Sequence, residues 1–209
     1  MHLIFFIIIC FGNCKEDEFK INTNQKIKNT GTKGTKINNK SNEISEEELI
    51  IKTGNCGTNL QYILKTKQLI ITGSGYMQDY TFNRESFSAA NSSTPWDSQK
   101  ETITEINISE ETVSIGSYAF YYFTSLTEIK LPSKLITIGE YAFSGCSQLT
   151  HINIPSEVTT IKISAFSYCT NLNSIELSSK TTEIGINAFD HCINLEKIEM
   201  FENNIFSSH

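Results

Sequence analysis

Apolar and polar residues recur from Ile115 onward with a spacing of 23 residues, and no insertion or gap is needed. Each repeat opens with isoleucine, contains an Ala-Phe pair and closes on a segment in which leucine or isoleucine alternates with polar residues. The repeat that begins at Ile138 reads IGEYAFSGCSQLTHINIPSEVTT. Alternation with a period of two predicts a short β-strand with one buried face, so each repeat should contribute one such strand. Ile103, Ile106 and Ile108 extend the register upstream by half a repeat.

Equivalent positions of the four repeats carry chemically uniform side chains. A repeat of this length predicts a solenoid in which each repeat forms one coil and like residues stack in ladders through a continuous core. The strands of successive coils should then align into a parallel β-sheet. The uniform columns are Ala119, Ala142, Ala165 and Ala188; Phe120, Phe143, Phe166 and Phe189; Phe123, Cys146, Cys169 and Cys192; Leu126, Leu149, Leu172 and Leu195; and Ile129, Ile152, Ile175 and Ile198.

Glycine marks the place where each coil is expected to bend. Gly116, Gly139 and Gly185 share one column, and a tight bend there would use the conformational freedom of glycine. Lys162 occupies the remaining position of the column, between Gly139 and Gly185, which indicates that the bend does not strictly require a left-handed backbone.

Residues 51–102 precede the repeats and are predicted to form a small β-rich cap. Residues 62–64 and 69–72 are apolar-rich segments on either side of Lys65-Thr66-Lys67, which predicts a hairpin. A cap is needed because the end of a solenoid exposes both a sheet edge and the ends of its apolar ladders. The single tryptophan, Trp96, is expected to pack over the first coil rather than to anchor a ligand.

The repeats, together with residues 56–62, residues 69–77 and Pro95-Trp96, resemble the BspA-like leucine-rich repeat family of surface and secreted proteins from bacteria and parasitic protists. The resemblance spans roughly Gly54 to the end of the chain. It implies a leucine-rich repeat solenoid over residues 103–209, made of a half coil plus four coils, and a role in adhesion to host cells or matrix. The chain departs from the family in having few coils, and Ser178 replaces the proline found at Pro132 and Pro155.

The N-terminal residues are predicted to form an export signal. Leu3 to Phe11 is apolar, which is too short for the ~20 residues that span a bilayer but fits a signal peptide over residues 1–14. Cleavage after Cys14 would release the protein, whereas cleavage before Cys14 would expose that cysteine for lipid attachment. Residues 15–50 carry only isolated apolar residues and are predicted to be a flexible linker. Both outcomes predict an extracellular or cell-surface location.

Composition and motifs favour binding over catalysis. The 209 residues carry a formal net charge of -6, which argues against a nucleic-acid partner. The column that holds Cys146, Cys169 and Cys192 begins with Phe123, so these cysteines are expected in the core. Cys56 is either buried in the cap or a reactive thiol. We identify no nucleophile, phosphate-loop or metal-ligand motif, and so predict a non-enzyme without cofactor or metal.

The outward positions of the predicted strands alternate with the buried columns and should form one polar face. We expect this face to be the binding surface, and the simpler alternative is that it is only the solvated side of the sheet. Asn91 and Asn107 begin N-glycosylation sequons, and a glycan on Asn107 would obstruct the face. The face is predicted to comprise Glu105, Asn107, Glu128, Lys130, His151, Asn153, Ser174, Glu176, Lys197 and Glu199.

These observations predict a monomeric, non-catalytic recognition module that binds a host or neighbouring-cell protein or glycan. Membrane contact is expected only through the possible N-terminal anchor. Two alternatives remain open: a structural spacer of the cell surface without a specific ligand, and a secreted enzyme inhibitor.

Overall fold

The computed structural model describes residues 49–83 and 92–201, the side chains of Met200 and Phe201 excepted. All of these belong to the second of two units of the chain, Ser41–His209. The predicted signal peptide, Cys14, the first 34 residues of the predicted linker and Asn91 lie outside the described residues. Ile50, which the sequence pattern assigned to the linker, is instead the first residue of strand β1.

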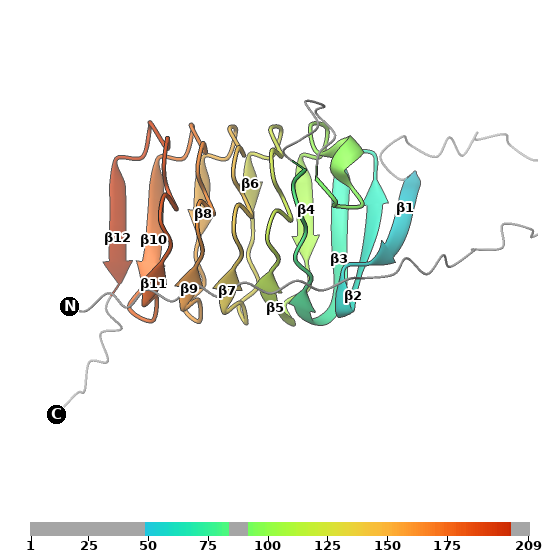
Figure 1. Ribbon diagram of the computed structural model, residues 1–209, viewed down its shortest axis with the longest axis horizontal. Coiled ribbons are helices and arrows are strands. Elements are labelled where there is room, and N and C mark those ends of the chain that lie inside the picture. Colours follow the sequence, from blue (N-terminus) through green and yellow to red (C-terminus); the bar gives the residue numbers. More distant parts are fainter. Residues whose placement is uncertain (1–48, 84–91, 202–209) are drawn as a thin grey trace, which may run out of the picture. The chain divides into compact units, whose positions relative to one another are not determined.

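Each coil contributes one strand to each of two parallel sheets, so the fold is the predicted solenoid with 23-residue coils (Figure 1). Ile129, Ile152, Ile175 and Ile198 are paired in register across the first sheet, which confirms the strand ladder. The strands of this sheet are β6 (Glu128–Ile129), β8 (His151–Asn153), β10 (Ser174–Ser178) and β12 (Lys197–Phe201). The strands of the second sheet are β5 (Thr112–Ile115), β7 (Thr137–Ile138), β9 (Thr160–Ile161) and β11 (Glu183–Ile184).

The cap is built on a long antiparallel hairpin that contains the two predicted segments. Its strands are β2 (Gly57–Lys65) and β3 (Gln68–Met77), and β1 (Ile50–Asn55) pairs with the outer side of β2. The first half of β3 pairs with β4 (Glu105–Ile108), and its last residues pair with β5. The hairpin is therefore continuous with the second sheet through β5, and through β4 it lies next to β6, the first strand of the first sheet.

A glycine pair allows β3 to pair with both β4 and β5. Gly73 and Gly75 both have φ of +99°. Gly73 follows the part of β3 that pairs with β4, and Gly75 is the first residue that pairs with β5. A side chain on Gly73 would also clash, because its Cβ would stand 2.0 Å from the carbonyl oxygen of Asn59. A short 3-10 turn, η2 (Asp97–Gln99), then connects the cap to the first coil.

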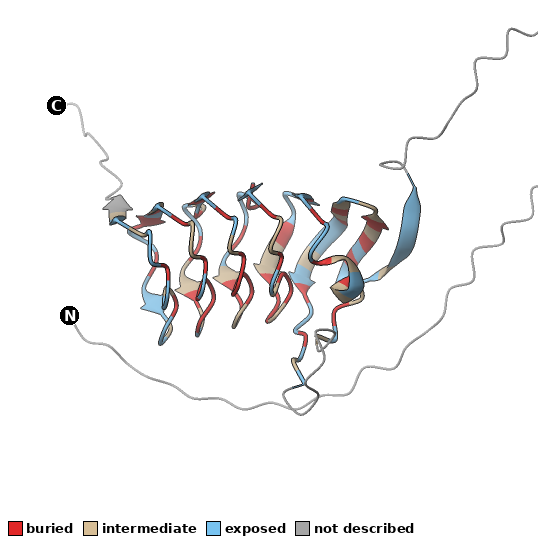
Figure 2. Cartoon of the chain, turned by 90° about the horizontal axis from the view of Figure 1, so that it is seen from above, coloured by how far each residue is buried: buried red, intermediate tan, exposed pale blue. Residues whose placement is uncertain are grey.

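A ladder of phenylalanine rings forms the centre of the core. Phe143 stacks on Phe166 with ring centroids 5.3 Å apart and an interplanar angle of 2°, and Phe166 stacks on Phe189 at 5.6 Å and 6°. Full burial of a ring, as at Phe143 and Phe166, stabilises the fold by roughly 1.5–3 kcal/mol, whereas Phe189 is only partly buried. Figure 2 shows that buried residues recur in every coil, whereas β1 is exposed along most of its length.

The bends use left-handed residues in two columns that are not the predicted glycine column. Positive φ angles between 51° and 60° occur at Tyr118, Tyr141, Ser164 and Asn187, and again at Tyr122, Tyr168 and His191. Gly145, with φ of 77°, completes the second column. These backbones stack through hydrogen bonds between coils, for example from Tyr168 N–H to the carbonyl oxygen of Asp190 (2.7 Å).

The predicted glycine column has a different function from the one expected. Gly116, Gly139 and Gly185 do not have positive φ; they allow neighbouring backbones to approach closely. A Cβ on Gly185 would lie 2.4 Å from the amide nitrogen of Ile163. The glycines of this column therefore serve close packing between neighbouring coils.

Proline sets the length of the strands in the first sheet. β6 and β8 end shortly before Pro132 and Pro155, whose nitrogen cannot donate to the ladder. At the equivalent Ser178, β10 continues and pairs with Phe201 of β12. The loss of the proline thus lengthens the last two strands.

Candidate binding surface

The ten predicted residues form two columns along the outward side of the first sheet and of β4. We call this surface the strand face. Strand pairing places Glu128, His151, Ser174 and Lys197 side by side, and likewise Asn153, Glu176 and Glu199. Glu105 and Asn107 occupy the equivalent positions of β4, and Lys130 directly follows β6. The pairing thus aligns side chains that lie far apart in the sequence.

Six of these residues line a shallow depression of about 880 Å³ across β4, β6 and β8. The depression also contains the threonines and apolar residues between them, including Thr127, Thr150 and Leu131. The other four predicted residues lie on β10 and β12, outside it. The six residues brought together are Glu105, Asn107, Glu128, Lys130, His151 and Asn153.

Short-range polar contacts orient the side chains in the depression. The Nδ2 atom of Asn107 donates to Oε1 of Glu105 at 2.7 Å. A ring nitrogen of His151 lies 2.9 Å from Oδ1 of Asn153. The side chain of Glu128 makes no hydrogen bond or ion pair among the described residues, so its carboxylate is available to a partner.

Lys130 is held at the rim of the depression by Glu110. Its Nζ lies 2.6 Å from Oε1 of Glu110, and the Ser133 N–H donates to Oε2 of the same carboxylate at 2.8 Å. The hydrogen bonds from Lys130 and Ser133 lower the pKa of Glu110 to about 2. Glu110 therefore stays ionised to a lower pH than an ordinary glutamate and remains paired with Lys130, although both side chains are exposed and the pair is weak.

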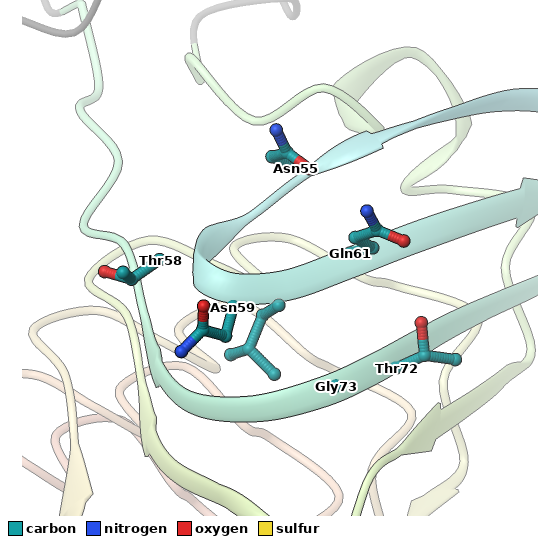
Figure 3. A pocket seen from close by; sticks show the side chains of 7 residues that line it. Asn55, Thr58, Asn59, Gln61, Thr72 and Gly73 are labelled. Carbon is teal, nitrogen blue, oxygen red and sulfur yellow. The ribbon is translucent and has the colours of Figure 1, made fainter.

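The strand face continues onto the cap, which the sequence pattern did not predict. Gln68 and Ile70 of β3 pair with Glu105 and Asn107, so their side chains share the outward side. Beyond them, Asn55, Gln61 and Thr72 form a row across three adjacent strands and line a second depression of about 390 Å³ (Figure 3). The alternation within β2 and β3 was visible in the sequence, but their register against β4 was not.

The described cysteines lie in the core rather than on the strand face. The thiol of Cys146 donates to the carbonyl oxygen of Phe120 (3.2 Å), and Cys169 and Cys192 make the same contact with Phe143 and Phe166. Burial raises the pKa of Cys146 to about 12, and also that of Cys56 in the cap. Contact with Cys192 and burial together raise the pKa of Cys169. All four thiols are free.

The described residues contain no group of three histidine, cysteine, aspartate or glutamate side chains that could hold a metal ion. His151 and His191 lie on separate coils; His191 contacts Asp190 at 2.9 Å and stacks on Tyr168. Within the described part of the chain, no helix is both long and apolar enough to cross a membrane. The chemistry available at the strand face is hydrogen bonding and charge pairing.

The architecture defines a leucine-rich repeat solenoid, a class whose extended surfaces serve in recognition. Residues 98–208 match the BspA type leucine rich repeat region in six copies. The chain therefore belongs to the BspA-type leucine-rich repeat family.

Two solved structures share the fold. A leucine-rich repeat protein from Eubacterium ventriosum is 23% identical, with a TM-score of 0.55 over 73% of this chain and 45% of its own length. A leucine rich cell surface protein from Faecalibacterium prausnitzii is also 23% identical, with a TM-score of 0.53 over 71% of this chain and 40% of its own. The chain thus spans less than half the length of either structure. No curated protein matches it.

Proposed function

We propose that this chain is a non-catalytic recognition module that binds a protein partner through the strand face. The observation that carries the proposal is the depression across β4, β6 and β8, where charged and amide side chains from three strands converge. β6 and β8 are paired and β4 lies beside β6, so the backbone positions of these residues are fixed before binding and little backbone entropy is lost. The mixture of Glu128, Lys130 and His151 suits a partner surface with both charges and hydrogen-bonding groups.

The module acts at the cell surface, where it takes part in adhesion. The similarity to a leucine rich cell surface protein supports this location, and so does the apolar segment at the N-terminus. Adhesion requires a surface that is accessible and rigid, and the strand face meets both conditions.

Saturable binding to intact neighbouring cells or extracellular matrix tests the proposal. The full chain should bind with a measurable plateau, and Glu128→Lys should weaken that binding because it reverses a charge that has no partner within the described part of the chain. Glu140→Lys is the matched control, since it makes the same change on the stretch after β7, away from the strand face. Circular dichroism would establish that both variants are folded.

The outcomes separate the candidate functions. A plateau that Glu128→Lys lowers and Glu140→Lys leaves unchanged supports recognition through the strand face. Equal effects of the two variants would place the site elsewhere. Binding that never saturates would identify the protein as a structural spacer.

A further inference from the structure

Among the described residues, nothing covers the C-terminal end of the fourth coil, in contrast to the first coil, which the cap covers. Within the described residues, no strand follows β12 in the first sheet or β11 in the second. Ile175 and Ile161 are fully buried in the third coil, whereas their equivalents Ile198 and Ile184 are 50% and 43% exposed. The edge of each sheet and the end of each apolar ladder therefore face outward together.

This end is also more apolar than the coils before it. Ile193 is 75% exposed and occupies a column that holds Thr124, Ser147 and Thr170 in the other coils. A terminal coil that meets only water is expected to carry polar residues on its outer side. The replacement of threonine or serine by isoleucine is the opposite change, and it indicates that another surface covers the end.

The charges of β12 identify a second copy of the chain as that surface. If two β12 strands pair antiparallel about Ile198, Lys197 of each copy stands opposite Glu199 of the other. Directly opposed unlike charges stabilise an antiparallel pair. A register centred on Glu199 would instead oppose two glutamates, so the charges select the register in which Ile198 meets Ile198. Lys197 and Glu199 already form an ion pair within the strand, which shows that both side chains lie on the same side.

We propose that the chain forms a two-fold symmetric dimer through the open end of its fourth coil, with β12 of the two copies paired antiparallel about Ile198. Isologous pairing closes the assembly at two copies. Pairing of β12 with β1 of another copy would instead form open filaments, and β1 carries Lys52 but no acidic residue to meet Lys197. The proposal replaces the monomer expected from the sequence.

The proposed dimer would also enlarge the binding surface. The two-fold axis of an antiparallel strand pair is perpendicular to the sheet, so the strand faces of both copies point to the same side. A partner with repeated sites could then engage both copies at once, which raises the apparent affinity without new contacts.

Sedimentation velocity of the full chain over a range of concentrations tests the dimer. The unmodified chain should sediment as a species with twice the mass of the monomer. Lys197→Glu and Glu199→Lys should each weaken self-association at least about tenfold, because either change opposes like charges at two places. The double variant Lys197→Glu/Glu199→Lys should restore it. Lys134→Glu, which changes an exposed lysine of the first coil, is the matched control and should leave the dimer unchanged.

A mixture of the two single variants gives the sharpest result. Each has only like charges on β12 and should be monomeric alone, but together they restore both opposite pairs and should form a mixed dimer. The β12 variants share residues 1–196 with the unmodified chain, so association through the N-terminal segment would be the same in each. The proposal is overturned if the unmodified chain stays monomeric, if it assembles beyond two copies, or if the mixture does not associate.

Discussion

The indole Nε1 of Trp96 donates a 2.7 Å hydrogen bond to the carbonyl oxygen of Ala119, which lies 23 residues later in the chain. The same ring stacks on Phe120 with centroids 6.3 Å apart and contacts Tyr62 and Tyr80 edge-on at 5.3 and 5.4 Å. Trp96 therefore extends the phenylalanine ladder by one ring toward the cap. It also packs with Tyr62 and Tyr80 of the cap. One side chain joins the cap to the solenoid.

Removal of this ring should strongly destabilise the protein. Trp96→Ala is expected to lower the free energy of unfolding by about 3–5 kcal/mol, because it leaves a large cavity between cap and coil. Trp96→Phe should cost about 1–3 kcal/mol, since the Ala119 carbonyl loses its donor while most of the apolar contact remains. Urea unfolding followed by circular dichroism measures both. Tyr76→Ala is the control, because Tyr76 is an exposed aromatic residue of the cap. Equal stability of all three variants would show that the cap does not depend on Trp96.

The junction between cap and first coil should also depend on Gly116. A Cβ at this position would stand 1.8 Å from the carbonyl oxygen of Gln78, and a backbone oxygen cannot rotate away. Gly116→Ala is expected to cost about 1–3 kcal/mol through overpacking, which thermal unfolding would detect as a lower Tm. Lys162→Ala changes the same column where a side chain is already present, and it should leave Tm nearly unchanged. A tolerated Gly116→Ala would contradict the close approach of these two segments.

Repetition explains why so much of the fold was predictable. Because like residues recur every 23 positions, the spacing alone assigns the Ile129 and Phe143 columns to the core and to coil stacking. Phe123 in the cysteine column indicated that Cys146 would be buried. The predicted packing of Trp96 over the first coil followed from the need to cover an apolar end.

The backbone at the bends was not predictable by the same reasoning. Tyr118 and Tyr122 adopt left-handed conformations that elsewhere favour glycine, so their residue type gave no signal. Hydrogen bonds between coils hold these conformations, which makes them a property of the stack rather than of the local sequence. The extension of the strand face to Gln61 was missed for a related reason, since the pairing of β3 with β4 is a tertiary contact.

The buried thiols should make the protein less stable at alkaline pH. In the unfolded chain, Cys56 and Cys146 titrate near 9.0, whereas burial raises the pKa of both to about 12. Between these values the folded state retains protons that the unfolded state has lost. The stability from each thiol is fully present below pH 9 and decreases by about 1.4 kcal/mol per pH unit above it.

Urea unfolding at pH 8.0, 9.5 and 10.5 would measure this slope. Cys146→Val removes one titrating group and should reduce the slope by the share of one thiol, although it also removes the hydrogen bond to Phe120 and shifts the stability at every pH. An identical slope in the variant would mean that Cys146 is not protected from deprotonation.

Asn107 should remain without sugar when the chain is produced in a eukaryotic secretory pathway. Its amide donates to Glu105, its backbone pairs with Ile70 of β3, and the Ser109 hydroxyl of the same sequon donates to the carbonyl oxygen of Gly73 at 2.7 Å. The folded strand therefore does not present the sequon as the flexible segment that glycosylation favours. Intact mass spectrometry should find the same glycan mass on the unmodified chain and on the control variant Asn107→Gln. An occupied Asn107 would place a bulky, solvated chain on the strand face beside Glu128, and the partner would then have to bind another surface.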